Sequence, residues 1–239
     1  MHRTLARLLG PATIALLALT VWLGLVVTPP DRVQGNLARL VYVHPAVAWV
    51  ALYLSFGTAT IASALYLWRR TRSVTLDRVA VSAMEVSLVF IVLTLVTGSI
   101  WGRPTWGVWW AWDARLTSTA ILGVLAAGYL ALRRANDDPQ RRATRSAVFA
   151  LVAAINVPII HFSVLWWKTL HQGATVFTAN HTLKIHGLMA WTLLLSFVAF
   201  SLAYLWLLRA RYRLEVARAR RESDDLTAAL AARVLEGRP

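Results

Sequence analysis

The 239-residue sequence has no cysteine, and this absence excludes several kinds of site at once. The chain forms no disulfide bond, offers no thiolate to a metal ion, and has no Cys-x-x-Cys-His site for covalent attachment of a cofactor. Any metal that the protein binds must therefore be held by nitrogen or oxygen atoms.

Acidic side chains are also scarce, with 11 Asp and Glu residues against 25 Lys and Arg, which gives a formal net charge of +14. In a soluble protein such an excess would suggest nucleic-acid binding. No nucleic-acid-binding motif or folded basic domain accompanies the charge, so we expect no nucleic-acid partner. The distribution of the charge along the chain has to explain it instead.

What the sequence has in excess is apolar residues, at 58% against roughly 45–50% in a soluble domain. They form six blocks, each close to the ~20 residues that a helix needs to cross a bilayer. We therefore predict an all-α, polytopic integral membrane protein, a bundle of six transmembrane helices surrounded by membrane lipid. The predicted spans cover residues 12–28, 45–67, 80–100, 116–132, 147–166 and 187–208.

The ends of the chain are expected to behave differently. The first block could be a signal peptide by length, but it lacks a clear small-x-small cleavage site and five spans follow, so we predict a retained helix. Residues 1–208 are expected to form one membrane domain, and residues 209–239 a charged cytoplasmic tail. In the tail, Leu226, Leu230 and Val234 are four residues apart, which predicts a short amphipathic helix.

The basic residues gather in every second segment outside the spans. Two lie before the first span, four between the second and third, five between the fourth and fifth, and eight in the tail, which is 19 of the 25 cations. The positive-inside rule makes this side cytoplasmic. Both termini are then cytoplasmic, as an even number of spans requires, and the other three segments face outward.

The outward-facing segment between the third and fourth spans is unusually rich in tryptophan. Five of the twelve tryptophans lie in the run WGRPTWGVWWAWD, from Trp101 to Asp113. Tryptophan is common at a bilayer surface as an anchor, but five in one loop exceed what an anchor needs. The run predicts a platform for a large, flat, apolar ligand.

The histidines show the same bias toward the outer face. His44 opens the second span and His171 follows the fifth, while His181 and His186 lie in or near the last outer loop and His161 lies inside the fifth span. Each alone is best explained as a headgroup contact or a hydrogen-bonded residue, although imidazole is also the usual nitrogen ligand of iron, zinc and copper. Two outer histidines with flat apolar walls would suit a planar iron macrocycle that takes an axial ligand on each face.

Two features inside the spans have more than one explanation. Glu85 is an ionised side chain near the inner end of the third span, where snorkelling and pairing with a loop arginine are equally compatible with its position. Asn156 and Pro158 predict a kink in the fifth span, with the freed carbonyl satisfied by a neighbouring helix. A substrate-coordinating break of the secondary-transporter type would call for a matching broken helix elsewhere.

The tryptophan run, continued by Arg115-Leu116-Thr117, resembles the WWD motif of the haem-handling proteins of c-type cytochrome maturation, a superfamily that includes CcmC, CcmF and CcsA. The length, the six spans and the cytoplasmic termini are similar to those of the CcmC family. The stretch NVPIIHFSVLWWKTLHQG, from Asn156 to Gly173, also resembles the fifth span and following loop of that family. The resemblance covers nearly the whole chain.

This resemblance implies a protein of the bacterial inner membrane that binds haem b non-covalently, presents it on the periplasmic face and hands it to the haem chaperone CcmE. It implies no enzymatic activity, because any covalent attachment of haem takes place on the partner. The ABC-type components CcmA and CcmB and the small protein CcmD are the other implied partners. The two outer histidines of the family match His44 and His171, as axial ligands of the haem iron.

The resemblance gives the WWD loop, residues 101–117, the role of holding the haem. We expect aromatic rings to lie against it, glycines to let the backbone approach it, and arginines to neutralise its propionates. Asp113 is expected to cap the start of the fourth span or to orient an arginine rather than to act as an acid or base. The expected haem-binding residues are Trp101, Gly102, Arg103, Trp106, Gly107, Trp109, Trp110, Trp112, Asp113 and Arg115.

Three other functions are weighed against this one. A secondary transporter that moves haem or another solute through its helix bundle would need polar residues near the midplane of the membrane. A membrane scaffold whose tryptophans only anchor it would bind no chromophore. A quinol-oxidising haem protein would need a second haem site across the bilayer, whereas these histidines gather on one face.

Overall fold

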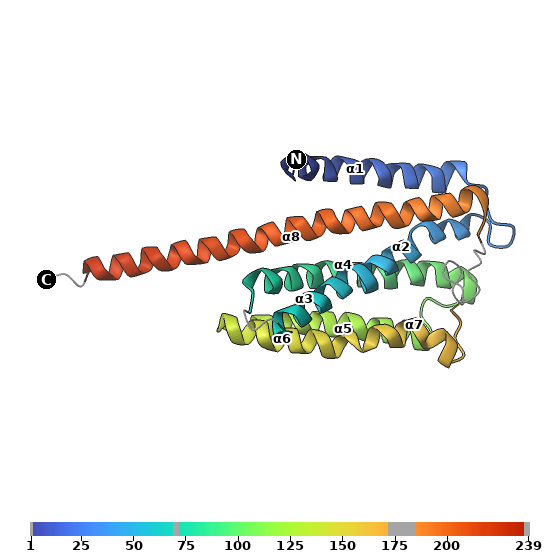
Figure 1. Cartoon of the computed structure of the whole chain (residues 1–239). Coiled ribbons are helices and arrows are strands. Elements are labelled where there is room, and N and C mark those ends of the chain that lie inside the picture. The colour runs from blue at the N-terminus through green and yellow to red at the C-terminus, as the bar shows by residue number, and fades with distance from the viewer. Residues whose placement is uncertain (1, 69–71, 172–184, 237–239) are drawn as a thin grey trace.

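The computed structural model describes residues 2–68, 72–171 and 185–236, and these residues form helices joined by short connections, with no β-strand among them (Figure 1). The elements are α1 (His2–Trp22) with the π-helix η1 (Leu23–Val27); the 3-10 helix η2 (Asn36–Tyr42); α2 (His44–Trp49), the π-helix η3 (Val50–Phe56) and α3 (Gly57–Trp68); α4 (Val74–Trp106); α5 (Ala114–Arg134); α6 (Pro139–Ala154) and α7 (Asn156–Trp166); and α8 (Gly187–Glu236).

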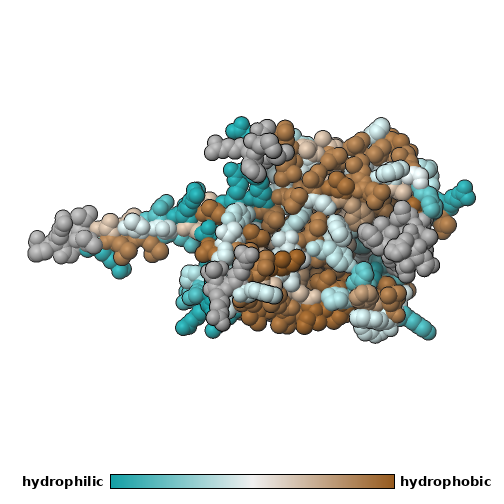
Figure 2. Space-filling model, viewed as in Figure 1, coloured by the Kyte–Doolittle hydropathy of each residue, from teal (hydrophilic) through white to brown (hydrophobic). Residues whose placement is uncertain are grey.

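Six helical stretches are long and apolar enough to cross a membrane, which confirms the predicted all-α, six-span architecture. Apolar side chains dominate the visible surface of the bundle, whereas the projecting end of α8 carries a mixture of polar and apolar ones (Figure 2). Both ends of the chain lie toward one end of the bundle, and the connections after α4 and η1 lie at the other (Figure 1). We call the end with the chain termini the inner end and the opposite one the outer end.

The central helix of the bundle is α4, which packs against α3, η3, α5 and α8. Its core contacts are large apolar side chains that are fully buried. Close packing of this kind, rather than a hydrophobic driving force, holds helices together in lipid. The core therefore fixes α4, whose outer end carries the first part of the tryptophan run. Representative core residues are Phe56, Met84, Ile91, Leu122 and Tyr129.

Besides the π-helix η1 at the end of the first span, the second and fifth spans are irregular in their middle. In the second, η3 follows α2, and the Ala51 carbonyl accepts hydrogen bonds from Ser55 Oγ at 3.1 Å and from Ser87 Oγ of α4 at 3.0 Å. Hydroxyl donors of this kind satisfy backbone groups that a π-turn displaces. In the fifth, Ile155 separates α6 from α7, and Asn156 Nδ2 donates to the Ser118 carbonyl of α5 at 2.7 Å. The helix breaks where Asn156 and Pro158 predict an irregularity, and the bond to the neighbouring helix comes from the Asn156 side chain rather than from a freed carbonyl.

The two acidic side chains of α4, Asp77 and Glu85, are paired toward its inner end. Glu85 accepts hydrogen bonds from Arg211, so its partner belongs to the helix α8 and not to a loop. Asp77 pairs with Arg133 through two bonds, at 2.6 Å and 2.9 Å. These pairs join α4 to α8 and to α5. The ion pair with Arg211 therefore explains why an acidic residue stands at position 85 inside the span.

Two elements extend further than the sequence predicts. The tryptophan run is not a loop throughout, because α4 continues to Trp106 and only residues 107–113 are non-helical. Pro104 lies in the last turn of α4, where its missing N–H removes a single backbone bond. The tail is likewise the continuation of α8 as far as Glu236, not a separate short helix, and Leu226 and Leu230 are exposed on it.

Candidate functional site

Two histidines that are far apart in the sequence meet at the outer end of the bundle. His44 is the first residue of α2, and His171 lies in the segment after α7. Their ring centres are 6.3 Å apart and the rings are inclined by 36°. The structure thus brings together the two residues that the sequence singles out as metal ligands.

His44 is held by the last turns of α4. Its Nδ1 lies 3.0 Å from the hydroxyl of Thr97, and that hydroxyl donates to the Leu93 carbonyl at 2.7 Å. Beside it, a methyl group added to Gly98 would lie 3.0 Å from His44 Cε1. The ring of His44 is therefore seated directly against the backbone of α4.

His171 is held by the end of the tryptophan run instead. Its Nδ1 lies 3.5 Å from Nη1 of Arg115, and the hydroxyl of Thr169 donates to its carbonyl at 3.1 Å. The amide of the preceding residue, Leu170, donates to Oδ2 of Asp113 at 2.7 Å. Asp113 and Arg115 together thus place the segment that carries His171.

Asp113 has two structural roles through its two carboxylate oxygens. Oδ1 accepts from the amides of Arg115 at 2.8 Å and Leu116 at 3.3 Å, which makes Asp113 the N-cap of α5, as predicted. Oδ2 accepts from Leu170, which the sequence does not indicate. An N-cap satisfies backbone donors that a helix start otherwise leaves unpaired. Here the same side chain also ties the start of α5 to the His171 segment.

Arg115 is the half-buried cation of the site. Its Nε donates to Ser163 Oγ at 3.3 Å and its Nη2 to the His161 carbonyl at 2.9 Å, both on α7. The remaining Nη1 faces His171. A guanidinium held on two sides in this way is oriented toward the histidine pair.

Arg103, the other arginine of the run, has a different environment. It is exposed, and its Nη1 donates to the Gly107 carbonyl at 2.6 Å. Gly107 has φ +80° and ends α4, with its amide bonded to the Arg103 carbonyl. Such a left-handed residue suits glycine because it has no Cβ. Arg103 and Gly107 therefore close the end of α4, whereas Arg115 lies at the histidines.

The tryptophans at the outer end divide into two groups. We call those beside the histidines the inner tryptophans and the exposed ones the outer tryptophans. Trp101 contacts His44 with ring centres 6.0 Å apart, and Trp106 contacts His171 at 6.1 Å. The ring of Trp106 lies over Gly102, where a Cβ would be 2.9 Å from Trp106 Cε3. Trp101 Nε1 also donates to Gln34 Oε1 at 3.0 Å, which fixes its ring. The inner tryptophans therefore form the walls beside the two histidines.

The outer group lies on the non-helical part of the run. Trp109 is 61% exposed and Trp112 85% exposed. Trp110 is half-buried and meets Trp112 edge-on, with ring centres 5.7 Å apart. Rings this exposed at the outer end are available to a ligand edge or to a partner protein.

The remaining histidines lie elsewhere. His161 Nδ1 lies 2.6 Å from the hydroxyl of Tyr53, so that ring faces the second span. His186 is exposed just before α8, and His181 lies outside the described residues. Among the histidines of the described residues, His44 and His171 are the pair whose rings contact each other.

The ligand set of the pair points to a particular kind of metal. Among the described residues, no three side chains of the His, Cys, Asp or Glu type gather as a metal site would require. A bare zinc ion usually takes three or four protein ligands. Two facing imidazoles fit a metal that already carries its equatorial ligands in a macrocycle.

Three contributors to this site were not found from the sequence. Thr97, Ser163 and Gln34 each make a hydrogen bond to a predicted site residue. A lone Ser, Thr or Gln near a span end carries no periodic or motif signal, because such residues are common there. Only the helix packing shows which of them face the histidines.

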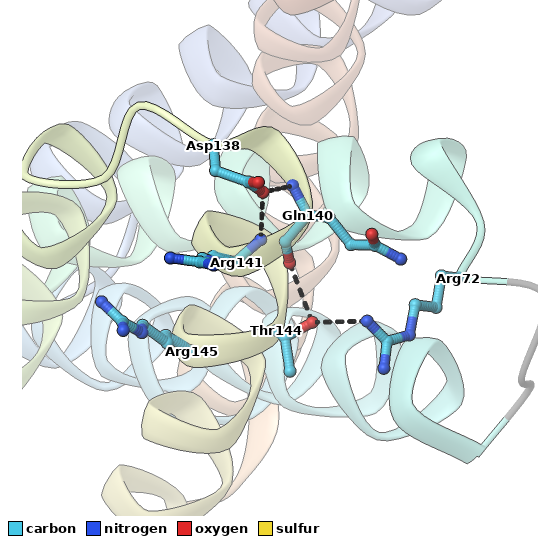
Figure 3. Close-up of a pocket in the computed structure, with 6 residues that line it drawn as sticks. All are labelled: Arg72, Asp138, Gln140, Arg141, Thr144 and Arg145. Atoms are coloured by element: carbon cyan, nitrogen blue, oxygen red, sulfur yellow. Dashed lines mark hydrogen bonds between the residues drawn. The ribbon is translucent and has the colours of Figure 1, made fainter.

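A hollow of about 400 Å³ lies at the inner end, lined by Arg72, Asp138, Gln140, Arg141, Thr144 and Arg145 (Figure 3). Arg72 Nη1 reaches Thr144 Oγ1 at 3.4 Å. The amides of Arg141 and Gln140 hold the pKa of Asp138 below its usual value, so this N-cap of α6 stays ionised at neutral pH. The lining is polar and has no aromatic wall, so this hollow does not suit a flat apolar ligand.

The sequence matches known proteins along most of its length. The family model described as CcmC, heme exporter protein C, matches residues 1–227. The heme exporter protein C of Bradyrhizobium diazoefficiens is 40% identical over 213 residues, which cover 89% of this chain and 79% of that one. That of Haemophilus influenzae is 39% identical over 206 residues, covering 85% and 81%. A putative cytochrome c biosynthesis ccmC-like mitochondrial protein of Arabidopsis thaliana is 35% identical over 198 residues, covering 83% and 73%.

Proposed function

The chain belongs to the heme exporter protein C family, whose members handle haem in cytochrome c biogenesis, and we propose that it holds haem between His44 and His171 and presents it for transfer. The observation that carries this proposal is the facing pair of histidines, with ring centres 6.3 Å apart at the outer end. The walls of the pair come from Trp101 and Trp106 of the WWD motif.

The spacing of the two rings suits haem iron. A metal–imidazole bond is roughly 2.0 Å long, and the ring centre lies about 1 Å beyond the bonded nitrogen. Two imidazoles on opposite faces of one metal therefore have centres about 6 Å apart, close to the 6.3 Å between His44 and His171. Haem b supplies four equatorial nitrogens and a redox-active iron, so two axial protein ligands complete its coordination.

The side chains around the pair suit the rest of the macrocycle. Trp101 and Trp106 offer apolar walls, and an aromatic contact is worth roughly 0.5–1.5 kcal/mol beyond area burial. The guanidinium of Arg115 can donate a short, strong hydrogen bond to a propionate carboxylate. By its position Arg115 is better suited to this role than Arg103, which is committed to the end of α4.

The contact between Arg115 and His171 has a consequence for haem binding. A guanidinium only donates, so Nδ1 of His171 accepts in that contact. If His171 binds iron through Nε2 as a neutral imidazole, its proton must be on Nδ1. A protonated Nδ1 cannot accept from Arg115, so Nη1 of Arg115 has to move away from His171. This Nη1 then becomes available to a propionate. Binding at His171 and binding of the propionate by Arg115 would thus favour each other.

We propose that transfer takes place at the outer end, by way of the exposed tryptophans. Trp109 and Trp112 are exposed there, where the haem chaperone CcmE would dock. The protein would bind, orient and release haem without catalysing a covalent step. In this proposal the inner end faces the cytoplasm of a bacterial inner membrane, and CcmA, CcmB and CcmD are further partners of the complex.

Transport of haem through the bundle itself is the alternative. A polar path would have to pass the middle of the bundle, where Ile91 of α4 lies in one buried apolar cluster with Phe56 and Leu122. The ion pairs of the third span lie at the inner end and are satisfied within the protein. This packing supports presentation at the outer end over passage through the described bundle.

The test is the visible spectrum of the protein purified from membranes in detergent. We expect a Soret band with the sharp α and β bands of low-spin, bis-histidine haem after reduction. His44→Ala and His171→Ala should each lose the low-spin bands, because each removes one axial nitrogen.

His186→Ala is the matched control, since it removes an exposed histidine at the same end of the bundle. Gel filtration and circular dichroism show whether each variant remains folded. Low-spin haem at the wild-type level in both single variants would refute the axial assignment, and a chromophore-free wild-type protein would refute haem binding.

A further inference from the structure

We propose that Thr97 and Gly98, consecutive residues of α4, position His44 so that its Nε2 carries the lone pair that faces the ligand. This inference rests on the proposed function, because it concerns how one of the two proposed ligands is presented. Neither residue belongs to the WWD motif, which begins at Trp101. Both act through His44 and are therefore positioning residues.

The first step of the argument concerns the proton on His44. The Thr97 hydroxyl has one proton and donates it within α4. The acceptor is the Leu93 carbonyl at 2.7 Å, and the Thr94 carbonyl at 3.2 Å is a second, longer acceptor of the same proton. The hydroxyl oxygen therefore has only lone pairs to offer to His44 Nδ1, 3.0 Å away. Nδ1 must then be the donor, and in a neutral imidazole the other nitrogen, Nε2, is unprotonated. This is the tautomer that a metal requires.

The second step concerns the position of the ring. A Cβ at Gly98 would lie 3.0 Å from Cε1 of His44, 3.6 Å from Nδ1 and 3.8 Å from Nε2. The ring thus lies against a stretch of helix backbone that has no side chain. A methyl group there would push the ring outward by a few tenths of an ångström. Only glycine leaves the ring where the Thr97 bond holds it.

The third step is that one turn of α4 holds the ring on three sides. Thr97 bonds Nδ1, Gly98 supports the Cε1 edge, and Trp101 meets the ring edge-on at an angle of 84°. Because α4 is the central, packed helix of the bundle, these contacts are set before any ligand arrives. His44 is therefore a preorganised ligand, in the sense that its tautomer and its direction are determined by the protein alone.

The first experiment tests the tautomer in the protein without haem. Protein labelled with ¹⁵N-histidine in detergent micelles should give the two-bond nitrogen–proton pattern of the Nδ1–H form for His44, with His44→Ala used to assign the signal. Thr97→Val should shift this signal toward the Nε2–H form or toward an average of both. A wild-type His44 that carries its proton on Nε2 would overturn the inference, whatever the haem content.

The second experiment measures haem binding. Thr97→Val keeps the shape of the side chain but removes the acceptor, and we expect roughly 10-fold weaker haem retention with a larger high-spin fraction. Thr97→Ser, which keeps the hydroxyl, should have wild-type haem retention and a wild-type high-spin fraction. The matched control is Thr60→Val, because Thr60 makes the same bond to its own helix, to the Phe56 carbonyl at 2.9 Å, and lies on α3.

Gly98→Ala should weaken the low-spin bands and shift the midpoint potential of the bound haem, since it displaces His44 without removing it. Gly57→Ala is its control, because a Cβ at that helical glycine meets nothing within 4 Å. If Gly98→Ala matches Gly57→Ala in spectrum and potential, the close approach has no function.

The two proposals fail in different ways. If His44→Ala keeps the low-spin spectrum, His44 is not an axial ligand and the proposed function fails at this residue. If His44→Ala loses it while Thr97→Val and Gly98→Ala keep wild-type spectra, affinity and potential, then His44 is a ligand but these two residues do not position it.

Discussion

The two histidines of the site are supported by different parts of the molecule. His44 stands on a helix and is held by Thr97 and Gly98 of the central helix α4, at the outer end of the bundle. His171 lies outside the helices and is held through Asp113 and Arg115, at the far end of the tryptophan run. The comparison shows that the last residues of the WWD motif support His171, while His44 is supported by Trp101 at the start of the motif and by two residues that precede it.

This difference has an energetic meaning. The support of His44 is part of the helix packing, so losing one contact leaves the ring close to its place. The described support of His171 includes two hydrogen bonds that involve charged groups, Asp113 and Arg115. A hydrogen bond to a charged group contributes roughly 1.5–3 kcal/mol. Substitutions on the His171 side should therefore have the larger effects.

The largest effect is expected for Arg115→Gln. The change removes the cation and its bonds to Ser163 and to the His161 carbonyl. The loss of roughly 1.5–3 kcal/mol corresponds to about 10- to 100-fold weaker haem retention, at ~1.4 kcal/mol per factor of ten. Haem content and the dissociation rate to apomyoglobin measure this.

Arg103→Gln is the control for that prediction, because it removes an arginine of the same motif that bonds only to the end of α4 among its described contacts. Its haem retention should stay within about twofold of wild type. Equal losses in the two variants would mean that positive charge in general, and not the place of Arg115, binds the propionates.

The next effect is expected for Asp113→Asn. The substitution keeps the shape of the side chain, but one carboxylate oxygen becomes an amide donor, so either the α5 cap or the bond to Leu170 is lost. A lost cap or buried acceptor costs roughly 1–2 kcal/mol, so we expect up to about tenfold weaker low-spin haem. Spectral titration with haem measures it.

Asp138→Asn is its control, because Asp138 caps α6 through the same pair of amide bonds, at 2.8 Å each, without a described bond to a histidine segment. Because Oδ1 of Asp138 alone accepts both bonds, Asp138→Asn should keep its cap and bind haem as the wild type does, and only Asp113→Asn should lose haem. Unchanged haem binding in Asp113→Asn would show that the Leu170 bond does not place His171.

A smaller effect is expected for Trp109→Ala combined with Trp112→Ala. Both rings are exposed and lie away from the histidine contacts, so bound haem should keep its spectrum while transfer falls severalfold. The readout is covalent haem on co-expressed CcmE, by in-gel peroxidase stain at matched protein levels. Trp101→Ala, on the inner side, should instead change the spectrum. Wild-type labelling of CcmE in the double variant would make these tryptophans membrane anchors.

The smallest effect is expected for His161→Ala. Its ring bonds to Tyr53 and faces the second span, so the haem spectrum should remain low-spin and its intensity close to wild type. Tyr53→Phe, which breaks the same bond from the other side, should behave alike. Loss of the low-spin bands in a folded His161→Ala protein would move the site into the bundle and favour transport through it.

Several features of the site could be predicted from the sequence because their signals are local. Asp113 precedes an apolar helix, which is the usual place of an N-cap, and the structure confirms the cap. Asn156 and Pro158 predict a break that the structure shows at Ile155. The sequence predicts a third span that ends at residue 100, whereas α4 continues to Trp106 through Gly102 and Pro104. In the structure Gly102 makes room for the ring of Trp106.

The sequence by itself determined the number of spans, the side on which the charges gather and the run of tryptophans, because hydrophobic length and charge are properties of each segment alone. Only the tertiary structure decided that His44 meets His171, that Thr97 and Gly98 support one ring and Asp113 and Arg115 the other, and that Trp101 and Trp106 lie inside while Trp109 and Trp112 lie outside. The physical reason is that these contacts join separate helices. Which faces of two helices meet depends on packing across the whole bundle, and no single segment carries that information.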